Sequence, residues 1–451
     1  MSKADTLKKV QNEETTGYAI TRVPGARRIS TYSLSTTWMG WIFYMGGPYM
    51  GALIAASMSP SAALSAIIAG NVLLFVIAYL NGDIGAKMGL SVSMCSRFSF
   101  GNIGTVIPSL VYWITLAGWF GVSIGLLAAV LESNIGGVAW LWSVITGVIM
   151  TIMAVYGMKV ISRFAFYVAP AILILMVVGF ALALGKMPAG QSLFPEGPFV
   201  GKSWLLAFGL TVSHWIVGAS LAPDVMRFAR SKKSVVWASF WGFVVANNLI
   251  MLLGVLTSWA LNTMDFFVVM PTLAGDFWKV LSLLVILGVV LTSGDCQCYT
   301  SGLALSNLTK WDSRVTTGIA GVMGVILAVS GIYGQAINWL LFLGIFVPGV
   351  PAVMIVDYYY HHNQKYPLVE NVRLGANWNA IIAYGIGAVV EHFMTNVWGV
   401  GVFALNAFVV TAVLYIILTS INKVRVFDPS APSASGYYLT PEEQREMGLS
   451  S

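Results

Sequence analysis

Long apolar runs without charged residues recur along the whole chain, and they leave few options for its fold. Only 9% of the 451 residues are charged and 57% are hydrophobic, whereas soluble domains carry roughly 25% charged residues. A run of about 20 apolar residues is long enough to cross a bilayer as a helix. Because backbone polar groups in lipid must be satisfied within the segment, such runs are expected to be helical. The sequence therefore predicts an all-α membrane protein.

Twelve apolar segments are long enough to cross a membrane, with helices expected near residues 30–56, 62–82, 105–131, 138–157, 164–185, 203–225, 235–261, 278–305, 315–333, 337–360, 376–393 and 400–421. An even number of crossings places both termini on one side. Of the 24 Lys and Arg residues, only Lys186, Lys202 and Lys279 fall on the other side. The positive-inside rule then predicts a multi-pass protein of the cytoplasmic (inner) membrane with both termini in the cytoplasm.

Two of the expected spans contain helix-breaking residues. The first carries FYMGGPYMGAL (Phe43–Leu53), and the sixth carries Gly218, Ser220 and Pro223. A break frees backbone amides and carbonyls, which is tolerated only where they line a protein cavity. Paired broken helices five spans apart are typical of the substrate site of a transporter built from an inverted repeat. We therefore expect a five-plus-five repeat, with residues 29–185 and 203–360 as its halves and residues 376–421 as two extra helices.

The rest of the chain offers no further domain. We expect a cytoplasmic tail at residues 1–28, a twelve-helix transporter domain at 29–421 and a second cytoplasmic tail at 422–451, which is polar and begins rich in Pro and Ser. The basic residues lie between spans, so the net charge of +6 does not indicate nucleic acid binding. Without a nucleotide-binding loop of the GxxxxGK[ST] type, an ion gradient is the expected energy source. We predict a monomer without a cofactor, driven by Na⁺ or H⁺ and embedded in the lipid bilayer.

Aromatic and polar residues near the predicted breaks are candidates for a ligand site. Trp119 and Trp215 could face each other across a cavity and sandwich a flat heterocycle. Most of the 16 tryptophans of the chain are nevertheless expected to pack or to lie at the membrane interface. His214 lies at the break expected in the sixth span, where it could donate to a ligand, carry a proton or bond a freed carbonyl. Gly218 follows within the same break.

The eighth span carries the unusually polar stretch LTSGDCQCYTSG. Asp295 is a carboxylate in an apolar helix, so it should face the interior of the bundle. There it could bind a cation, accept from a ligand or hold a half-helix in place. Gln297 is a further candidate for the substrate site. Thr292 and Ser293 could coordinate sodium, or could serve in helix packing.

Several stretches together carry a resemblance to a known family. The most specific are IGAKMGL with RFSFG (residues 84–101) and APDVMRFAR (residues 222–230). With them the chain resembles the nucleobase:cation symporter-1 family, most closely its cytosine permease branch. The resemblance implies the leucine-transporter-type fold with helices 1 and 6 broken. It also implies symport of a nucleobase or related flat nitrogen heterocycle, of the cytosine and purine class, with a cation by alternating access.

The same resemblance implies roles for individual residues. Trp119 and Trp215 match the aromatic residues that stack on the two faces of the ligand. Gly40 and Phe43 match backbone positions of the sodium site in the first span. Gly294 and Asp295 fall on the Asn-Asp ligand motif of the eighth span.

Departures from the cytosine permease pattern leave the substrate and the ion open. Leu116 stands where that branch has a glutamine, Gly294 replaces an asparagine and His214 replaces a serine. A ligand that needed those partners would leave its polar edge unpaired. Hydantoin, allantoin or a thiamine-precursor pyrimidine are therefore alternative substrates, and protons are an alternative to sodium. A channel is the alternative from another class of function; no nucleophile or metal constellation indicates an enzyme.

Overall fold

The computed structural model describes residues 21–56, 58–156, 158–195, 204–424, 426–428 and 433–434. Within these ranges the chain forms helices and no β-strand; the only pairings of extended backbone are two isolated bridges. Seven helical stretches of this part of the chain are long and apolar enough to cross a membrane. The prediction of an all-helical membrane protein is thus confirmed.

The described residues form, in chain order, α2 (Thr31–Ile42), α3 (Gly46–Ala55), α4 (Pro60–Met88), α5 (Val92–Phe100), α6 (Val106–Ile135), α7 (Ala139–Tyr156), α8 (Met158–Lys186), α9 (Trp204–Ser220), α10 (Ala222–Met226), α11 (Lys232–Ser239), α12 (Asn248–Leu261), α13 (Phe266–Val269), α14 (Asp276–Thr309), α15 (Ser313–Val329), α16 (Ala336–Phe346), α17 (Gly349–Ile355), α18 (Trp378–Asn396) and α19 (Phe403–Ile421). Two π-helical segments, η2 (Phe240–Asn247) and η5 (Val356–His361), continue α11 and α17. The remaining elements are short 3₁₀ turns.

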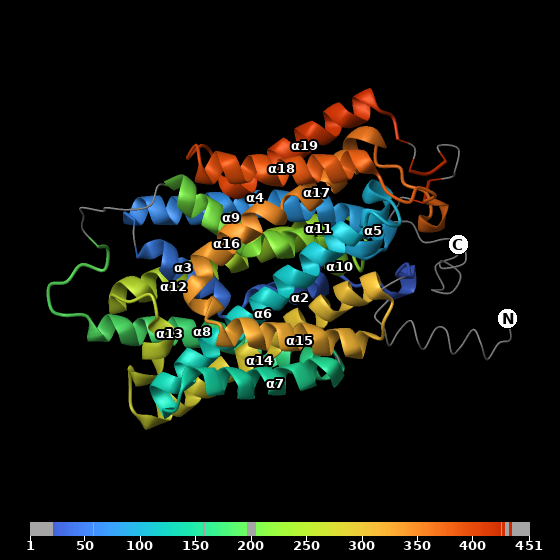
Figure 1. The fold of residues 1–451 in the computed structure, drawn as a ribbon. Coiled ribbons are helices and arrows are strands. Elements are labelled where there is room, and N and C mark those ends of the chain that lie inside the picture. The colour runs from blue at the N-terminus through green and yellow to red at the C-terminus, as the bar shows by residue number, and fades with distance from the viewer. Residues whose placement is uncertain are drawn as a thin grey trace.

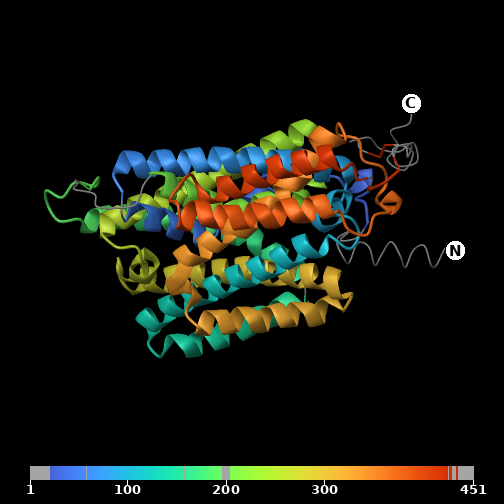
Figure 2. The same ribbon diagram turned by 45° about the horizontal axis from the view of Figure 1, so that its top comes forward.

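The helices lie roughly side by side along one direction (Figures 1 and 2). The pair α18 and α19 forms one flank, and α7 packs with α15 at the opposite flank. Between them α6 packs along α14, and α4 packs along α9. The helix α5 lies at one end of this bundle and α13 at the other (Figure 1); we call these the α5 end and the α13 end.

The predicted break in the first span is confirmed between α2 and α3. The helix α2 ends at Ile42, and α3 begins at Gly46. In a continuous helix the N–H of Tyr44 would donate to the carbonyl of Gly40. It donates instead to the carbonyl of Ile42 at 2.9 Å. The Gly40 carbonyl thus loses its helical donor, as expected for a helix that opens beside a site.

The break in the sixth span is also present, and it lies within residues 218–223, the stretch that indicated it. The helix α9 runs unbroken to Ser220, and only Leu221 separates it from α10. His214, Trp215 and Gly218 therefore lie within a regular helix, and the prediction that His214 sits at the break is wrong. The physical reason is Pro223, which lacks an N–H and so disturbs the helix beginning with the residue four positions earlier.

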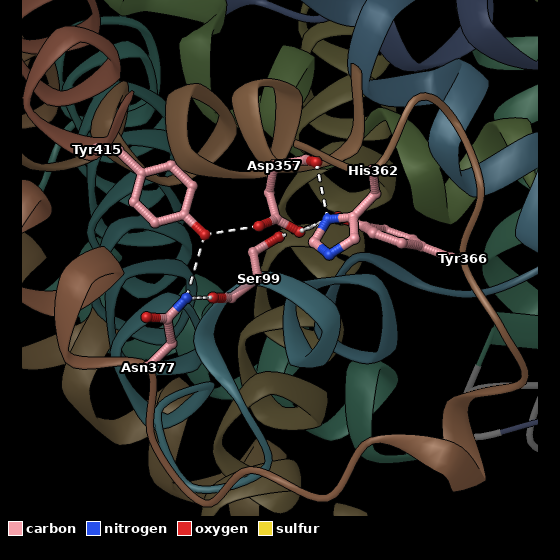
Figure 3. A network of polar contacts seen from close by, with 6 residues as sticks. All are labelled: Ser99, Asp357, His362, Tyr366, Asn377 and Tyr415. Carbon is pink, nitrogen blue, oxygen red and sulfur yellow. Dashed lines mark hydrogen bonds and ion pairs between the residues drawn. The ribbon is translucent and has the colours of Figure 1, made fainter. Parts of the chain in front are cut away.

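A buried polar network closes the α5 end of the bundle (Figure 3). The carboxylate of Asp357 in η5 accepts hydrogen bonds from the Tyr366 hydroxyl at 2.5 Å and the Tyr415 hydroxyl at 2.6 Å. Nδ1 of His362 lies 3.3 Å from the same carboxylate. Because Tyr415 belongs to α19, the network ties the end of α17 and η5 to the last helix.

Asn377 extends this network to α5. Its Nδ2 donates to the Ser99 carbonyl at 2.7 Å and to the Tyr415 hydroxyl at 3.1 Å (Figure 3). The ring of Phe427, beyond the end of α19, lies 4.7 Å from the ring of His362. The segment after α19 therefore packs onto the loop that follows η5.

The described parts of the two expected tails are packed at the α5 end. The N–H of Val23 donates to the Gly89 carbonyl at 2.8 Å, and directly after the N-terminal tail the N–H of Ile29 donates to the Phe228 carbonyl at 2.8 Å. Val23 and Phe427 are buried, so these described parts of the tails pack against the helical bundle. Residues 1–20 and 435–451, where we placed most of both tails, lie outside the described residues.

Candidate functional site

Four aromatic side chains, from two helices and from the break between α2 and α3, meet at this break. Tyr44 lies in the break, Trp119 in α6, and His214 and Trp215 in α9. The ring centroid of Tyr44 lies 5.6 Å from that of His214, 5.6 Å from that of Trp215 and 6.5 Å from that of Trp119. All four side chains are buried. We call Tyr44, Trp119, His214 and Trp215 the aromatic box.

The rings of the box follow a simple geometric pattern. Tyr44 and His214 are parallel to within 5°. Both are nearly perpendicular to the indole of Trp119, at 80° and 76°, and to the indole of Trp215, at 89° and 86°. A flat ring that stacked on either indole would therefore lie nearly perpendicular to the rings of Tyr44 and His214.

The Tyr44 hydroxyl lies over the imidazole and not at its edge. Its oxygen is 3.2 Å from Nδ1 and 3.3 Å from Nε2 of His214. The lone pairs and N–H bonds of the two nitrogens diverge in the ring plane, so an oxygen equally close to both in a parallel stack is aligned with neither. Neither ring nitrogen of His214 is therefore engaged by a well-aligned bond to Tyr44.

The indole of Trp215 is held by the shape of its own helix. A Cβ at Gly218 would overlap the six-membered ring of Trp215, so glycine at this position lets the indole lie against α9. The indole N–H of Trp215 is buried and has no hydrogen-bond partner among the described residues. A buried donor of this kind is costly to leave unpaired, which favours a ligand acceptor at this point. Gly218 thus contributes by shaping the box.

The polar residues of α14 have different surroundings. Asp295 is fully buried, and neither carboxylate oxygen has a hydrogen-bond partner in the part of the chain that the structure describes. Gln297 accepts through Oε1 from the Ser123 hydroxyl of α6 at 3.1 Å. A Cβ at Gly294 would overlap the end of the Met150 side chain in α7. Gly294 therefore serves the close packing of α14 on α7.

The residues expected to hold a cation lie on two elements. Gly40 and Phe43 flank the opening between α2 and α3, where the Gly40 carbonyl has lost its helical donor. On α14, the hydroxyl of Thr292 donates to the Gly288 carbonyl at 3.0 Å and that of Ser293 to the Val289 carbonyl at 2.8 Å. Their oxygens keep lone pairs that can accept or coordinate.

Tyr44 is the member of the box that sequence reasoning missed. It lies in the stretch FYMGG that indicated the first break, but the glycines and the proline drew attention to the backbone. An aromatic residue directly before a glycine pair in a broken span is the signal that could have identified it. Its side chain contacts all three of the other rings, so it is central to the site.

Comparison with known proteins identifies the family of this chain. Residues 22–418 match the model of one family, described as permease for cytosine/purines, uracil, thiamine, allantoin. The chain belongs to this family. The match covers all four residues of the aromatic box.

Similar proteins agree with this assignment. The permease is 29% identical over 400 residues to the cytosine permease of Escherichia coli (strain K12), covering 88% of this chain and 93% of that protein. It is 26% identical over 238 residues to the allantoin permease of Bacillus subtilis (strain 168), covering 47% and 48%. The inward-facing structure of Mhp1 superposes with a TM-score of 0.80 at 17% identity, covering 95% of this chain and 97% of that one. This permease therefore shares the fold of Mhp1.

Proposed function

We propose that this permease is a secondary active transporter that imports a nucleobase or a related flat nitrogen heterocycle together with a cation. The observation that carries the proposal is the aromatic box, in which two indoles, a phenol and an imidazole meet in the interior of the bundle. Stacking on aromatic faces suits a flat heterocycle, and the Trp215 N–H and the His214 nitrogens offer polar contacts to its edge. Membership of a permease family supports transport.

The proposed topology is the one that charge and helix breaks indicate. Twelve membrane-spanning segments would form a five-plus-five inverted repeat plus two extra helices, with both termini and the α5 end in the cytoplasm of the inner membrane. The breaks at Phe43–Met45 and Leu221 fall in the first and sixth of these segments. Broken helices at corresponding places in two halves support alternating access around a site between them. We propose that the monomer is the transporting unit.

In this proposal Trp119 and Trp215 stack on the ring of the substrate, and His214 addresses its polar edge. Asp295 and Gln297 contribute from α14, and Gly218 and Gly294 allow the close packing that shapes the site. The coupling cation, Na⁺ or H⁺, would bind between the open backbone at Gly40 and Phe43 and the hydroxyls of Thr292 and Ser293, which precede Asp295 on α14. A carboxylate such as Asp295 that is buried without a partner must be neutral or accompanied by a cation, which supports coupling through this part of the bundle.

A hydantoin or allantoin is the second candidate substrate, and a specific observation favours it over cytosine. Position 214 of the box is an imidazole, and position 116, three residues before Trp119 on α6, is a leucine, so an amide that could pair with the base edge is absent from position 116. A structural neighbour, Mhp1 in a closed conformation, was solved with bromovinylhydantoin bound and superposes with a TM-score of 0.77.

Uptake into proteoliposomes tests the proposal directly. Purified protein would be offered radiolabelled cytosine, hypoxanthine, uracil, allantoin and benzylhydantoin, with an inward sodium gradient, an inward proton gradient or neither. We expect saturable, gradient-dependent accumulation of one chemical class. Flux of all compounds without saturation would indicate a channel, and absence of accumulation with every gradient would contradict symport.

A further inference from the structure

The break between α9 and α10 leaves two backbone carbonyls without their helical donors. In a continuous helix the carbonyl of Ala219 would accept from residue 223, but Pro223 has no N–H. The carbonyl of Ser220 would accept from the N–H of Asp224, which donates instead to the Leu221 carbonyl at 2.9 Å. Ala219 and Ser220 are fully buried, so water cannot readily replace the missing donors.

Asn81 of α4 supplies a donor to one of these carbonyls. Its Nδ2 donates to the Ser220 carbonyl at 2.6 Å. The Asn81 side chain is fully buried, and its Oδ1 has no hydrogen-bond partner among the described residues. A buried amide that leaves its own oxygen unpaired is unfavourable by itself. The favourable contribution of Asn81 therefore comes from the hydrogen bond that its Nδ2 donates to the Ser220 carbonyl.

The same helix also holds the segments on either side of the break. A Cβ at Gly70 of α4 would crowd the Thr211 side chain of α9, and a Cβ at Gly85 would overlap Pro223 of α10. Asn81 lies between these two glycines along α4. The helix α4 thus contacts α9 through Gly70, the break through Asn81 and α10 through Gly85. The contact made by Asn81 is the polar one of the three.

We propose that Asn81 is a positioning residue, which sets the angle between α9 and α10 and thereby holds His214 and Trp215 in register with Tyr44 and Trp119. The inference rests on the proposed function, because it assigns Asn81 to the same substrate site. Without this bond the Ser220 carbonyl could accept from the N–H of Asp224, which would make the backbone at Leu221 more helical. If it did not, the carbonyl would stay unpaired and the angle between α9 and α10 would be less well fixed. Either change displaces the end of α9 that carries half of the aromatic box.

A matched control is available on the same helix. Asn71 is as fully buried as Asn81, but its Nδ2 donates to Asn248 Oδ1 at 2.9 Å and its Oδ1 accepts from Asn247 Nδ2 at 2.6 Å. It therefore serves the packing of α4 on α12 and η2, away from the break. Asn71→Leu removes the same functional group at the same burial without touching the Ser220 carbonyl.

The first readout needs no substrate. Amide hydrogen exchange of residues 217–226 would be compared in purified wild-type protein, Asn81→Leu and Asn71→Leu. We expect exchange about fivefold faster in Asn81→Leu, the effect of losing one net hydrogen bond, and no change in this segment for Asn71→Leu. Unchanged exchange in Asn81→Leu, or the same increase in both variants, would overturn the proposal.

The second readout is transport of the labelled panel at equal amounts of protein in the membrane. We expect the KM of Asn81→Leu for the transported compound to rise about tenfold, because the binding groups are displaced, with a much smaller change in maximal rate. Asn71→Leu should keep the wild-type KM. Equal KM values for wild type and Asn81→Leu would overturn the role. If the wild-type protein transported no compound of the panel, the proposed function would be contradicted. The hydrogen-exchange comparison would still test whether Asn81 stabilises the break.

A second variant covers the case in which Asn81→Leu does not fold. Pro223→Ala restores an N–H for the Ala219 carbonyl and permits a more continuous helix. We expect slower exchange at residues 221–226 and a raised KM, since the same angle is altered from the other side. Unchanged exchange at residues 221–226 together with a wild-type KM in Pro223→Ala would contradict the proposal.

Discussion

The phenol of Tyr44 and the imidazole of His214 lie parallel to within 5°, with their centroids 5.6 Å apart. This stack joins the break of the first span to the intact helix α9, and it also contacts both indoles of the box. A flat substrate that enters the box must therefore displace the Tyr44 ring or pack beside it. The two possibilities make opposite predictions for the hydroxyl.

We expect Tyr44→Phe to bind the transported heterocycle more tightly. The variant keeps the ring but loses the contact of its hydroxyl with His214, so the ring is more easily displaced. Because this hydroxyl is aligned with neither ring nitrogen, we expect the affinity to change about twofold, at the low end for a net hydrogen bond. Isothermal titration of purified protein measures it. Tyr49→Phe is the control, because Tyr49 contacts Tyr333 instead; weaker binding of Tyr44→Phe would show that the hydroxyl binds substrate directly.

We expect substitutions of Trp119 and Trp215 to impair uptake, whereas substitutions of exposed tryptophans should not. Stacking on one indole is worth roughly 0.5–1.5 kcal/mol beyond buried area. We therefore expect Trp119→Ala to raise KM at least about tenfold and Trp119→Phe to retain part of the activity. Trp140→Ala, at an exposed position on α7, should transport like wild type. Normal uptake by Trp119→Ala at wild-type expression would remove Trp119 from the site.

The fold class was predictable because lipid leaves few alternatives for apolar segments. The interruption before Gly46 was readable from the glycines and the proline. The second break was predictable to residues 218–223 but not to a single residue, because Gly218, Ala219 and Ser220 are all compatible with a helix and only Pro223 removes a hydrogen bond. Its effect appears at Leu221, after His214 and Trp215.

The site was only partly predictable, because its contacts join segments far apart in the chain. His214 and Trp215 were singled out by position and type, but their neighbour Tyr44 is 170 residues away from His214. Likewise, Asn81 became informative only when the structure placed it against the Ser220 carbonyl. Gly294, expected beside the ligand, packs against Met150; the sequence alone does not say which way a helical glycine faces.

Asp295 offers a test of the coupling ion. Its carboxylate is fully buried and unpartnered among the described residues, and such a group is stable only when protonated or bound to a cation. We expect Asp295→Asn, which resembles the neutral form, to fold as stably as wild type. It should lose gradient-driven accumulation but retain exchange of labelled for unlabelled substrate.

Counterflow and accumulation assays on the same proteoliposomes separate these steps. Asp276→Asn is the control, since Asp276 is an exposed acid at the start of the same helix. Full accumulation by Asp295→Asn would exclude Asp295 from coupling, whereas loss of both exchange and accumulation would indicate a role in substrate binding.

The network around Asp357 predicts a pH-dependent stability. Burial acts to lower the pKa of His362, but its hydrogen bond to Asp357 and the charge of that carboxylate outweigh burial and raise the pKa above the usual value. A group whose pKa is higher in the folded state stabilises the fold fully below its unfolded pKa, about 6.5 for histidine. This contribution is lost as the pH rises through the folded pKa. The other titratable groups that face the pair are His361, Tyr366 and Tyr415.

We therefore expect the melting temperature of wild-type protein to exceed that of His362→Gln most clearly near pH 6, with the difference shrinking toward pH 8.5. Differential scanning fluorimetry across this range measures it. His392→Gln is the matched control, because His392 is exposed and bonds Asn396 on its own helix. A difference between wild type and His362→Gln that stays constant with pH would mean that His362 stabilises the α5 end through packing against Phe427 and not through its charge.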